Sequence, residues 1–158
     1  MGNSSTAPGY HPSEVKVSIL DARNLPLYRK RKGGNYGSST IVIFSIGDQV
    51  VRTLERSTET GNAVYNQSWT FKFTMPEHSP LFIQIKDMEL GILGSHEVPF
   101  EEIPYSPHRD RKTLFSFVFK PTIASDKLAD VTVINSEKQC ELLFNARVTQ
   151  LHFKVNSR

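Results

Sequence analysis

Residues 39–54, STIVIFSIGDQVVRTL, contain two apolar segments rich in β-branched residues, separated by the dipeptide Gly47-Asp48. Valine, isoleucine and threonine favour β-strands, and a two-residue turn that contains glycine is typical of a hairpin. The stretch therefore predicts two antiparallel strands, at residues 39–46 and 49–54. Little helical periodicity is present elsewhere in the chain, so this hairpin indicates an all-β fold.

Alternation of apolar and polar residues continues on both sides of this hairpin. In SWTFKFT, the aromatic side chains of Trp69, Phe71 and Phe73 alternate with polar ones, as in a strand with one buried face. The connection at residues 121–138 is interpreted as either a short helix or an extra edge strand. With turn residues between the segments, the pattern predicts an eight-stranded antiparallel β-sandwich. The six further strands are expected at residues 15–20, 68–74, 80–87, 94–100, 113–120 and 140–153.

The length of 158 residues fits a single domain. Residues 1–13, MGNSSTAPGYHPS, are small, polar and interrupted by proline and glycine, so they predict a flexible N-terminal arm before one domain at residues 14–155. No run approaches the ~20 apolar residues of a membrane span, and no apolar signal segment is expected at the N-terminus. The single cysteine, Cys140, lies in the apolar run CELLF, which predicts a buried, unreactive thiol and a reducing compartment.

Positive charge is concentrated in the first third of the chain. The net charge is +3, and residues 1–56 carry eight Lys or Arg against four Asp or Glu, a net of +4. Half of those eight cations form the run Arg29–Lys32, RKRK. A local basic patch indicates a negatively charged partner more strongly than the overall isoelectric point does.

Four segments occur in an order and spacing that a known family shares: VKVSILDARNLP at 15–26, GSSTIVIFSIG at 37–47, YNQSWTFKF at 65–73 and LFIQIKD at 81–87. Together they resemble a C2 domain, a lipid-binding β-sandwich, from about Glu14 to Phe100. The resemblance implies a C2-like fold with residues 142–148 in the last strand. Because a short arm precedes the first strand and a strand closes the chain, it also implies the permuted connectivity called type II.

The C2 family binds Ca²⁺ through carboxylates of two loops at one end of the sandwich, and this chain departs from that pattern. The basic run occupies the position of the first aspartate, and Ser39 replaces a second one. In the third loop Asp87 and Glu89 remain, whereas Ca²⁺ takes six to eight oxygen ligands. The resemblance therefore implies a Ca²⁺-independent variant with no metal site and no cofactor.

In the family the first and third loops lie side by side, which implies a membrane-binding surface in this chain. Basic side chains would meet anionic phospholipid head groups, and apolar side chains would enter the interface. The alternative is that Ile92 and Leu93 pack inward and that the basic run is only solvated. The predicted lipid-binding residues are Tyr28, Arg29, Lys30, Arg31, Lys32, Met88, Leu90 and Ile92.

Two further features point to a membrane. A second basic face is predicted from Arg52 and Lys72, assigned to outward positions on adjacent strands, together with Lys86. The N-terminal sequence MGNSST matches the N-myristoylation pattern with Gly2 as acceptor; the alternative is a chance match or a cloning remnant. One myristoyl chain binds weakly without a second signal, which the basic run could supply. The predicted location is cytoplasmic and peripheral, on the inner face of a membrane.

Other functions are weighed against membrane binding. The chain lacks a P-loop, a G-x-S-x-G elbow and an H-E-x-x-H motif, so it is not expected to be an enzyme. The main alternative is a protein-interaction or scaffold module without direct lipid binding, in which the acidic residues Glu97, Glu101 and Glu102 and the basic run form opposed docking surfaces. Nucleic acid is not favoured as a partner, because one four-residue run gives few phosphate contacts and no aromatic stacking surface accompanies it.

Overall fold

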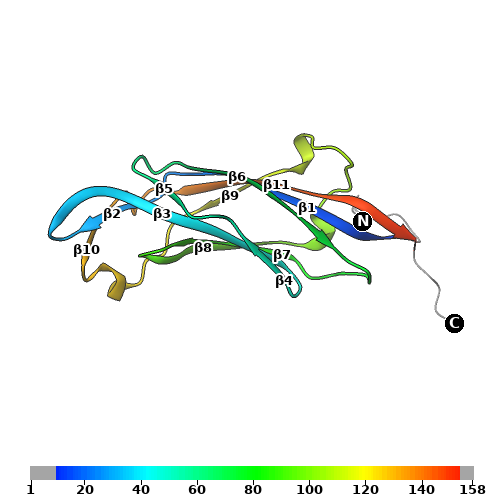
Figure 1. Cartoon of the computed structure of the whole chain (residues 1–158), viewed down its shortest axis with the longest axis horizontal. Helices are drawn as coiled ribbons and strands as arrows, with labels where there is room; N and C mark the ends of the chain where they lie inside the picture. The colour runs from blue at the N-terminus through cyan, green and yellow to red at the C-terminus, as the bar shows by residue number, and fades with distance from the viewer. Residues whose placement is uncertain (1–9, 154–158) are drawn as a thin grey trace.

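The protein is a sandwich of two antiparallel sheets, which Figure 1 shows as two layers. The computed structural model describes residues 10–153, which form eleven strands and three short 3₁₀-helices. The predicted all-β antiparallel sandwich is confirmed, with three strands more in the described residues than the eight expected. The strands are β1 Tyr10–Arg23, β2 Leu27–Lys30, β3 Gly33–Ile46, β4 Gln49–Arg52, β5 Arg56–Thr58, β6 Ala63–Lys72, β7 Leu81–Asp87, β8 Gly91–Val98, β9 Leu114–Phe119, β10 Val131–Ile134 and β11 Cys140–Phe153, and the helices are η1 Phe100–Glu102, η2 Arg111–Thr113 and η3 Ser125–Leu128.

One sheet contains four strands in the order β6-β1-β11-β9. At its centre, the first and last described strands pair with each other from Tyr10↔Phe153 to Arg23↔Glu141. The other edge of β1 pairs with β6 along most of its length. The type II connectivity that the sequence implies stays a prediction.

The second sheet has seven strands built around the long strand β3. Strands β10, β2, β3, β7 and β8 follow one another across it, and β4 and β5 also pair with β3. The hairpin predicted from residues 39–54 is confirmed by the pairs Ile46↔Gln49 and Ile43↔Arg52. Gly47 in its turn has φ 61°, a backbone conformation that favours glycine.

The hydrophobic core fills the space between the two inner faces. Alternate residues of β7 are buried, as its period-two pattern predicts. Across the core, the rings of Phe44 and Trp69 meet edge to face with their centroids 5.0 Å apart, a favoured aromatic geometry. Cys140 is buried as predicted, and burial raises the pKa of its thiol to about 12.

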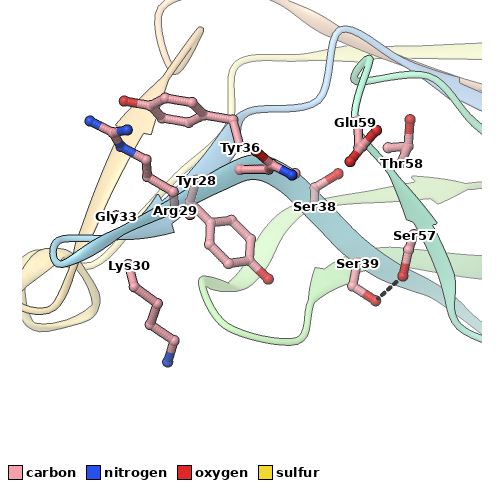
Figure 2. A pocket seen from close by; sticks show the side chains of 13 residues that line it. Tyr28, Arg29, Lys30, Gly33, Tyr36, Ser38, Ser39, Ser57, Thr58 and Glu59 are labelled. Carbon is pink, nitrogen blue, oxygen red and sulfur yellow. Dashed lines mark hydrogen bonds between the residues drawn. The ribbon is translucent and has the colours of Figure 1, made fainter.

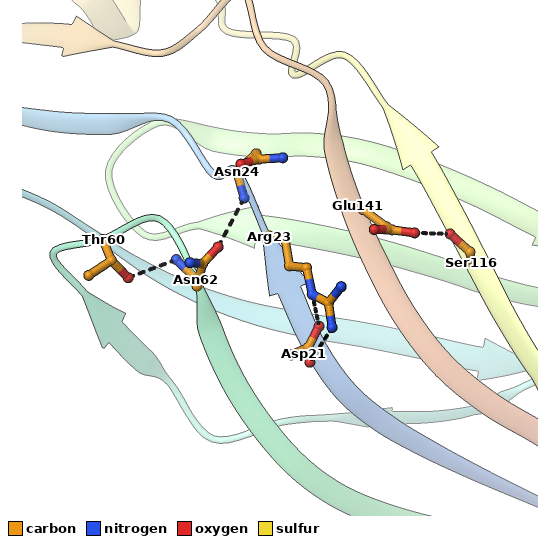
Figure 3. Close-up of polar contacts among 7 residues, drawn as sticks. All are labelled: Asp21, Arg23, Asn24, Thr60, Asn62, Ser116 and Glu141. Carbon is orange, nitrogen blue, oxygen red and sulfur yellow. Dashed lines mark hydrogen bonds and ion pairs between the residues drawn. The ribbon is translucent and has the colours of Figure 1, made fainter.

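The connection between β1 and β2 is anchored to the loop before β6, as Figure 3 shows in part. The Leu25 amide donates to the Gly61 carbonyl at 2.9 Å, and the Asn24 amide donates to the Asn62 side chain at 3.4 Å. Leu25 itself is fully buried. These contacts fix the position from which the chain enters strand β2.

Two features of the chain ends and connections refine the sequence-based boundaries. Strand β1 begins at Tyr10, five residues earlier than the strand expected at residues 15–20, because residues 10–12 pair with the end of β11. Residues 10–13 thus belong to the sheet rather than to the predicted arm, while the myristoylation candidate Gly2 lies outside the described residues. Within 121–138 both expected alternatives occur, because η3 is a short helix and β10 is a strand that pairs with β2.

Candidate functional site

A hairpin rich in basic residues projects from one end of the sandwich, at the left of Figure 1. We call residues 27–37, which join β2 to the start of β3, the basic hairpin. Its turn consists of Arg31 and Lys32, and β3 begins directly after it with Gly33 and Gly34, whose φ angles of 119° and 108° suit glycine. The sequence predicts a loop for Arg29–Lys32. The structure corrects this prediction: the first half of the run is strand, because β2 pairs with β3 on one side and with β10 on the other.

The cations of the basic hairpin differ in exposure. Lys30, Arg31 and Lys32 are exposed at its outer end, whereas Arg29 is half-buried. The guanidinium carbon of Arg29 lies 4.8 Å from the centroid of the Tyr36 ring, a cation–π contact that fixes the side chain against the hairpin (Figure 2). The surface available to a large partner is therefore formed by the three exposed cations rather than by all four.

Three contacts tie the outer end of the hairpin to neighbouring segments. The Lys30 ammonium forms an ion pair with Glu89 at 3.3 Å, beside the turn between β7 and β8. The Arg31 amide donates to the Asp130 carbonyl at 3.1 Å, and its guanidinium donates to the Leu128 carbonyl at 3.3 Å. The basic hairpin and the turn between β7 and β8 therefore lie side by side, as the resemblance implies for the first and third loops. The segment around η3 also contacts the hairpin.

Sequence reasoning missed Lys127, which η3 brings to the same end of the molecule. Its Cε atom lies 4.0 Å from the position that a Cβ would occupy on Gly91, at the start of β8. Lys127 is exposed, and so are Asp126 and Asp130 beside it. The signal was weak because residues 121–138 show no clear periodicity that would place them in the fold.

The β7–β8 turn and the start of β8 present two of the three predicted apolar residues, Met88 in the turn and Ile92 on β8. Met88 and Ile92 are each 47% exposed, whereas Leu90 is 2% exposed and belongs to the core. The prediction that Leu90 contacts lipid is wrong, and so is the alternative that Ile92 packs inward; Leu93 does pack inward. We call the exposed cations and apolar residues at this end the tip surface, which consists of Lys30, Arg31, Lys32, Met88, Ile92 and Lys127.

Asp87 is a buried hydrogen-bond acceptor that holds the tip together. Its carboxylate accepts hydrogen bonds from the amides of Ser39 at 3.3 Å, Glu89 at 2.8 Å and Leu90 at 2.9 Å, and from the Tyr28 hydroxyl. Burial raises the pKa of Asp87 above its usual range, although these hydrogen bonds act in the opposite direction. Burial, and then the charge of Asp87, also raises the pKa of Tyr28 above its ordinary value.

The two carboxylates that remain in the third loop are thus engaged by protein groups. Both oxygens of Asp87 accept hydrogen bonds from the protein, and Glu89 pairs with Lys30. Tyr28, predicted to contact lipid, is half-buried and turned toward Asp87 instead. Among residues 10–153, no group of three or more His, Cys, Asp or Glu side chains is close enough together to hold a metal ion.

Only two of the three residues of the second predicted basic face, Arg52 and Lys86, lie on the same sheet. Arg52 on β4 pairs with Ile43, and Lys86 on β7 pairs with Ile41, so both cations project from the outer face of the seven-stranded sheet. Lys72 lies on β6, in the four-stranded sheet. The prediction that Arg52 and Lys72 occupy adjacent strands is therefore wrong, since alternation within a strand does not reveal which sheet the strand joins.

A cavity of about 690 Å³ lies between the basic hairpin and β5, as Figure 2 shows. Its wall is rich in hydroxyl groups, including Ser38 on β3 and Ser57 on β5, and it also contains Arg29 and Glu59. Sequence reasoning missed it because β5 was not predicted, and its pairing with β3 brings Ser57 and Thr58 beside Ser38 and Ser39. In the part of the chain that the structure describes, no helix is long and apolar enough to cross a bilayer.

Comparison with known proteins agrees with this architecture. A family model described as the C2 domain matches residues 13–115, and the chain belongs to the C2 domain family. No curated protein sequence matches the chain.

Solved structures of other proteins share the fold at low sequence identity. A single C2 domain of a plant extended synaptotagmin 1 is 14% identical, with a TM-score of 0.54 over 89% of this chain and 98% of that one. A structure of extended synaptotagmin 2 that contains its SMP domain and its C2 domains is 20% identical, with a TM-score of 0.51 over 91% of this chain and 27% of that one. Human GIVD cytosolic phospholipase A2 is 17% identical, with a TM-score of 0.51 over 95% of this chain and 19% of that one. The chain therefore spans about a quarter of the extended synaptotagmin 2 structure and about a fifth of the phospholipase structure.

Proposed function

We propose that this C2 domain binds anionic phospholipid membranes through the tip surface and does so without Ca²⁺. The observation that carries the proposal is the placement of exposed Met88 and Ile92 beside the exposed cations Lys30, Arg31 and Lys32. Cations attract anionic head groups, while apolar side chains gain by leaving water for the interface. The domain acts as a binding module rather than as an enzyme.

The expected strength of this contact is moderate. Each cation near an anionic surface contributes about 1 kcal/mol, and each buried methylene contributes about 0.8 kcal/mol. Glu89, Asp126 and Asp130 lie close to the tip surface and reduce its net positive charge. Binding through this surface alone is therefore expected to be reversible and sensitive to salt.

Independence from Ca²⁺ is supported by the contacts of Asp87. A Ca²⁺ ion at this position would have to displace three backbone amides and a tyrosine hydroxyl from one buried carboxylate. Ca²⁺ also takes six to eight oxygen ligands, several of them charged. Exposed cations that are permanently charged provide the attraction that a bound metal would otherwise supply.

The proposed location is the cytoplasmic face of a membrane, with the protein attached peripherally. N-myristoylation of Gly2 would add a second signal, because one acyl chain and one basic patch together hold more firmly than either alone. Intact-mass measurement of protein made in cells that contain the acylating enzyme tests Gly2 separately from the tip surface.

Sedimentation of the full chain with vesicles tests the proposal. We expect the bound fraction to rise with the phosphatidylserine content of phosphatidylcholine vesicles and to fall as salt is increased. Binding that is equal on pure phosphatidylcholine would contradict an electrostatic contact. Absence of binding to any vesicle would contradict the proposal and would favour the protein-interaction module.

Replacing Glu89 with glutamine is expected to strengthen vesicle binding about fivefold. The substitution removes the negative partner of Lys30, and one unit of charge near an anionic surface is worth about 1 kcal/mol. Asp48→Asn is the matched control, because Asp48 is an exposed carboxylate in the β3–β4 turn, at the opposite end of β3 from the hairpin. Equal effects of the two substitutions on vesicle affinity would show that only the net charge of the protein matters.

A further inference from the structure

We propose that the outer edge of strand β9 binds an extended peptide segment of a partner protein, with an alternating apolar centre and acidic residues at both ends. The segment adds a fifth strand to the four-stranded sheet, next to β9. This inference goes beyond the proposed membrane contact, because β9 contributes no residue to the tip surface.

Strand β9 has a backbone edge that no strand occupies. It is the last strand in the order β6-β1-β11-β9, and β11 pairs with it from Cys140↔Phe119 to Asn145↔Leu114. Within residues 10–153 no other strand pairs with it. A strand at the edge of a sheet presents a row of amide and carbonyl groups, which is a template for one more strand.

The other edge strands of the described chain carry features that discourage pairing, and β9 does not. Strands β4, β5 and β10 have four residues or fewer. The pairings of β6 with β1 and of β8 with β7 contain register shifts. The six residues of β9, LFSFVF, include no charge, proline or glycine, and its pairing with β11 is regular. Because proteins usually protect their sheet edges, an unprotected one indicates a partner.

The other sheet holds β9 in place before any peptide arrives. The ring of Phe117 stacks on His96 of β8, with the centroids 4.7 Å apart. The ring of Phe119 lies against Gly94 of β8, only 2.5 Å from the position that a Cβ would occupy there. An edge that is already fixed loses little conformational entropy when a peptide pairs with it.

The outward side chains of β9 indicate the centre of the peptide. Leu114 and Val118 are 49% and 52% exposed, and they lie on the same face because side chains alternate along a strand. Between them, the Ser116 hydroxyl donates to Glu141 on β11. Neighbouring side chains on the same face of a sheet interact, so apolar residues in the added strand pack beside Leu114 and Val118.

Positive charge at both ends of β9 indicates the ends of the peptide. Arg111 and Lys112 are exposed just before the strand, and Lys120 follows it directly. The nearby carboxylate of Asp110 is occupied, because it accepts the Lys112 amide as the cap of η2. Lys120 pairs with Glu137 at 3.4 Å, but both side chains are largely exposed, so the pair is weak and a peptide carboxylate can replace Glu137.

The same charges disfavour a second copy of this chain as the occupant. Antiparallel pairing of two β9 strands, with Leu114 opposite Phe119, brings Lys120 of one copy beside Lys112 of the other. Like charges on neighbouring strands repel each other. The charges therefore favour an acidic segment of a different protein.

Calorimetric titration of the full chain with three synthetic peptides tests the proposal. The acidic peptide has six alternating threonine and valine residues, to match the six residues of β9, between glutamate pairs. The basic peptide has lysines in place of the glutamates, and the methylated peptide is the acidic one with every central amide nitrogen methylated. We expect the acidic peptide to bind and the other two to bind roughly tenfold more weakly, because one loses the charge contacts and the other loses the backbone donors.

Each failure of this pattern has a definite meaning. Absence of binding by the acidic peptide would overturn the proposal. Equal affinity for the acidic and basic peptides would overturn the acidic character of the partner. Equal affinity for the acidic and methylated peptides would overturn pairing through the backbone of β9.

A matched pair of substitutions locates the contact on the sheet. Val118→Glu is expected to weaken the acidic peptide roughly tenfold, because it replaces an apolar contact with a repelling charge. Val64→Glu is the control, since Val64 is 56% exposed on β6, at the opposite edge of the same sheet. Equal effects of the two substitutions on the affinity would overturn the assignment to β9.

A second pair tests the charges at the end of the strand. Arg111→Ala with Lys112→Ala is expected to weaken the acidic peptide about fivefold. Arg52→Ala with Lys86→Ala removes the same charge from the outer face of the other sheet and should leave the affinity unchanged. Equal losses in the two proteins would show that only net charge matters and would overturn the proposed charge contact.

Amide hydrogen exchange of the wild-type protein gives a readout that depends on no substitution. We expect the acidic peptide to slow exchange within residues 114–119 and to leave β6 unchanged. Unaltered exchange within residues 114–119 would overturn the site.

Two measurements distinguish other occupants of the edge. A concentration-dependent dimer in sedimentation equilibrium that Val118→Glu abolishes would show that a second copy covers the edge, and it would overturn the peptide assignment. Weaker vesicle binding by Val118→Glu than by Val64→Glu would show that the edge contacts the membrane, and it would overturn the assignment as well. Peptide binding without vesicle binding would contradict the proposed membrane function alone.

Discussion

Replacing Arg31 and Lys32 together with alanine is expected to weaken binding to phosphatidylserine vesicles about 30-fold. Both side chains are exposed at the outer end of the basic hairpin. Two cations at about 1 kcal/mol each amount to about 2 kcal/mol, which corresponds to that change in affinity. The dissociation constants of the two proteins for vesicles of one composition, measured at one salt concentration, give the comparison directly.

The control for this experiment is the double substitution Arg111→Ala with Lys112→Ala. These residues lie on η2 before β9, away from the hairpin, and they are equally basic and exposed. The control protein carries the same net charge as the hairpin variant. If both proteins lose the same affinity, the tip surface is not the contact. Thermal unfolding of both proteins shows whether loss of the Arg31 contact to the Leu128 carbonyl has disturbed the fold.

Replacing Asp87 with alanine is expected to lower the free energy of unfolding by about 3 kcal/mol. The substitution removes the acceptor of three backbone amides, and a buried donor left without a partner costs about 1–3 kcal/mol. Asp87→Asn keeps one acceptor oxygen and should cost distinctly less. Urea unfolding of the three proteins gives these values, and a loss below about 1 kcal/mol for Asp87→Ala would show that the turn does not depend on Asp87.

The same carboxyl group gives the stability of the fold a dependence on pH. The pKa of Asp87 is raised in the folded state, so the folded protein holds this proton more readily than the unfolded one. The contribution of Asp87 is therefore fully present below the ordinary aspartate pKa and is lost as the pH rises through the raised value. We expect the stability of the wild-type protein relative to Asp87→Asn to increase as the pH is lowered from neutrality. A constant difference would contradict the raised pKa.

Much of the fold could be predicted because its strands have one buried face. The hairpin at residues 39–54 and the alternating strand that contains Trp69 follow directly from period-two patterns. Strand β2, with the sequence LYRK, has no such pattern, and it exists because β3 and β10 supply its backbone partners. Short strands that depend on neighbours distant in sequence are not visible in a local pattern.

At the candidate site, the sequence likewise predicted which segments lie together but not the direction of every side chain. The juxtaposition of the basic run and the third loop followed from the family resemblance, and the Lys30–Glu89 ion pair confirms it. The inward direction of Leu90 did not follow, because it is set by the turn that the backbone forms around Asp87. Lys72 was misplaced because the sheet to which β6 belongs depends on its pairing with β1.

The central claim is that this C2 domain binds anionic membranes through permanent positive charge rather than through a metal ion. Sedimentation with phosphatidylserine vesicles, in millimolar Ca²⁺ and in excess chelator, tests it most directly. We predict the same bound fraction in both conditions, at every phosphatidylserine content, with binding that falls as salt increases. Binding that appears only when Ca²⁺ is added would contradict the claim.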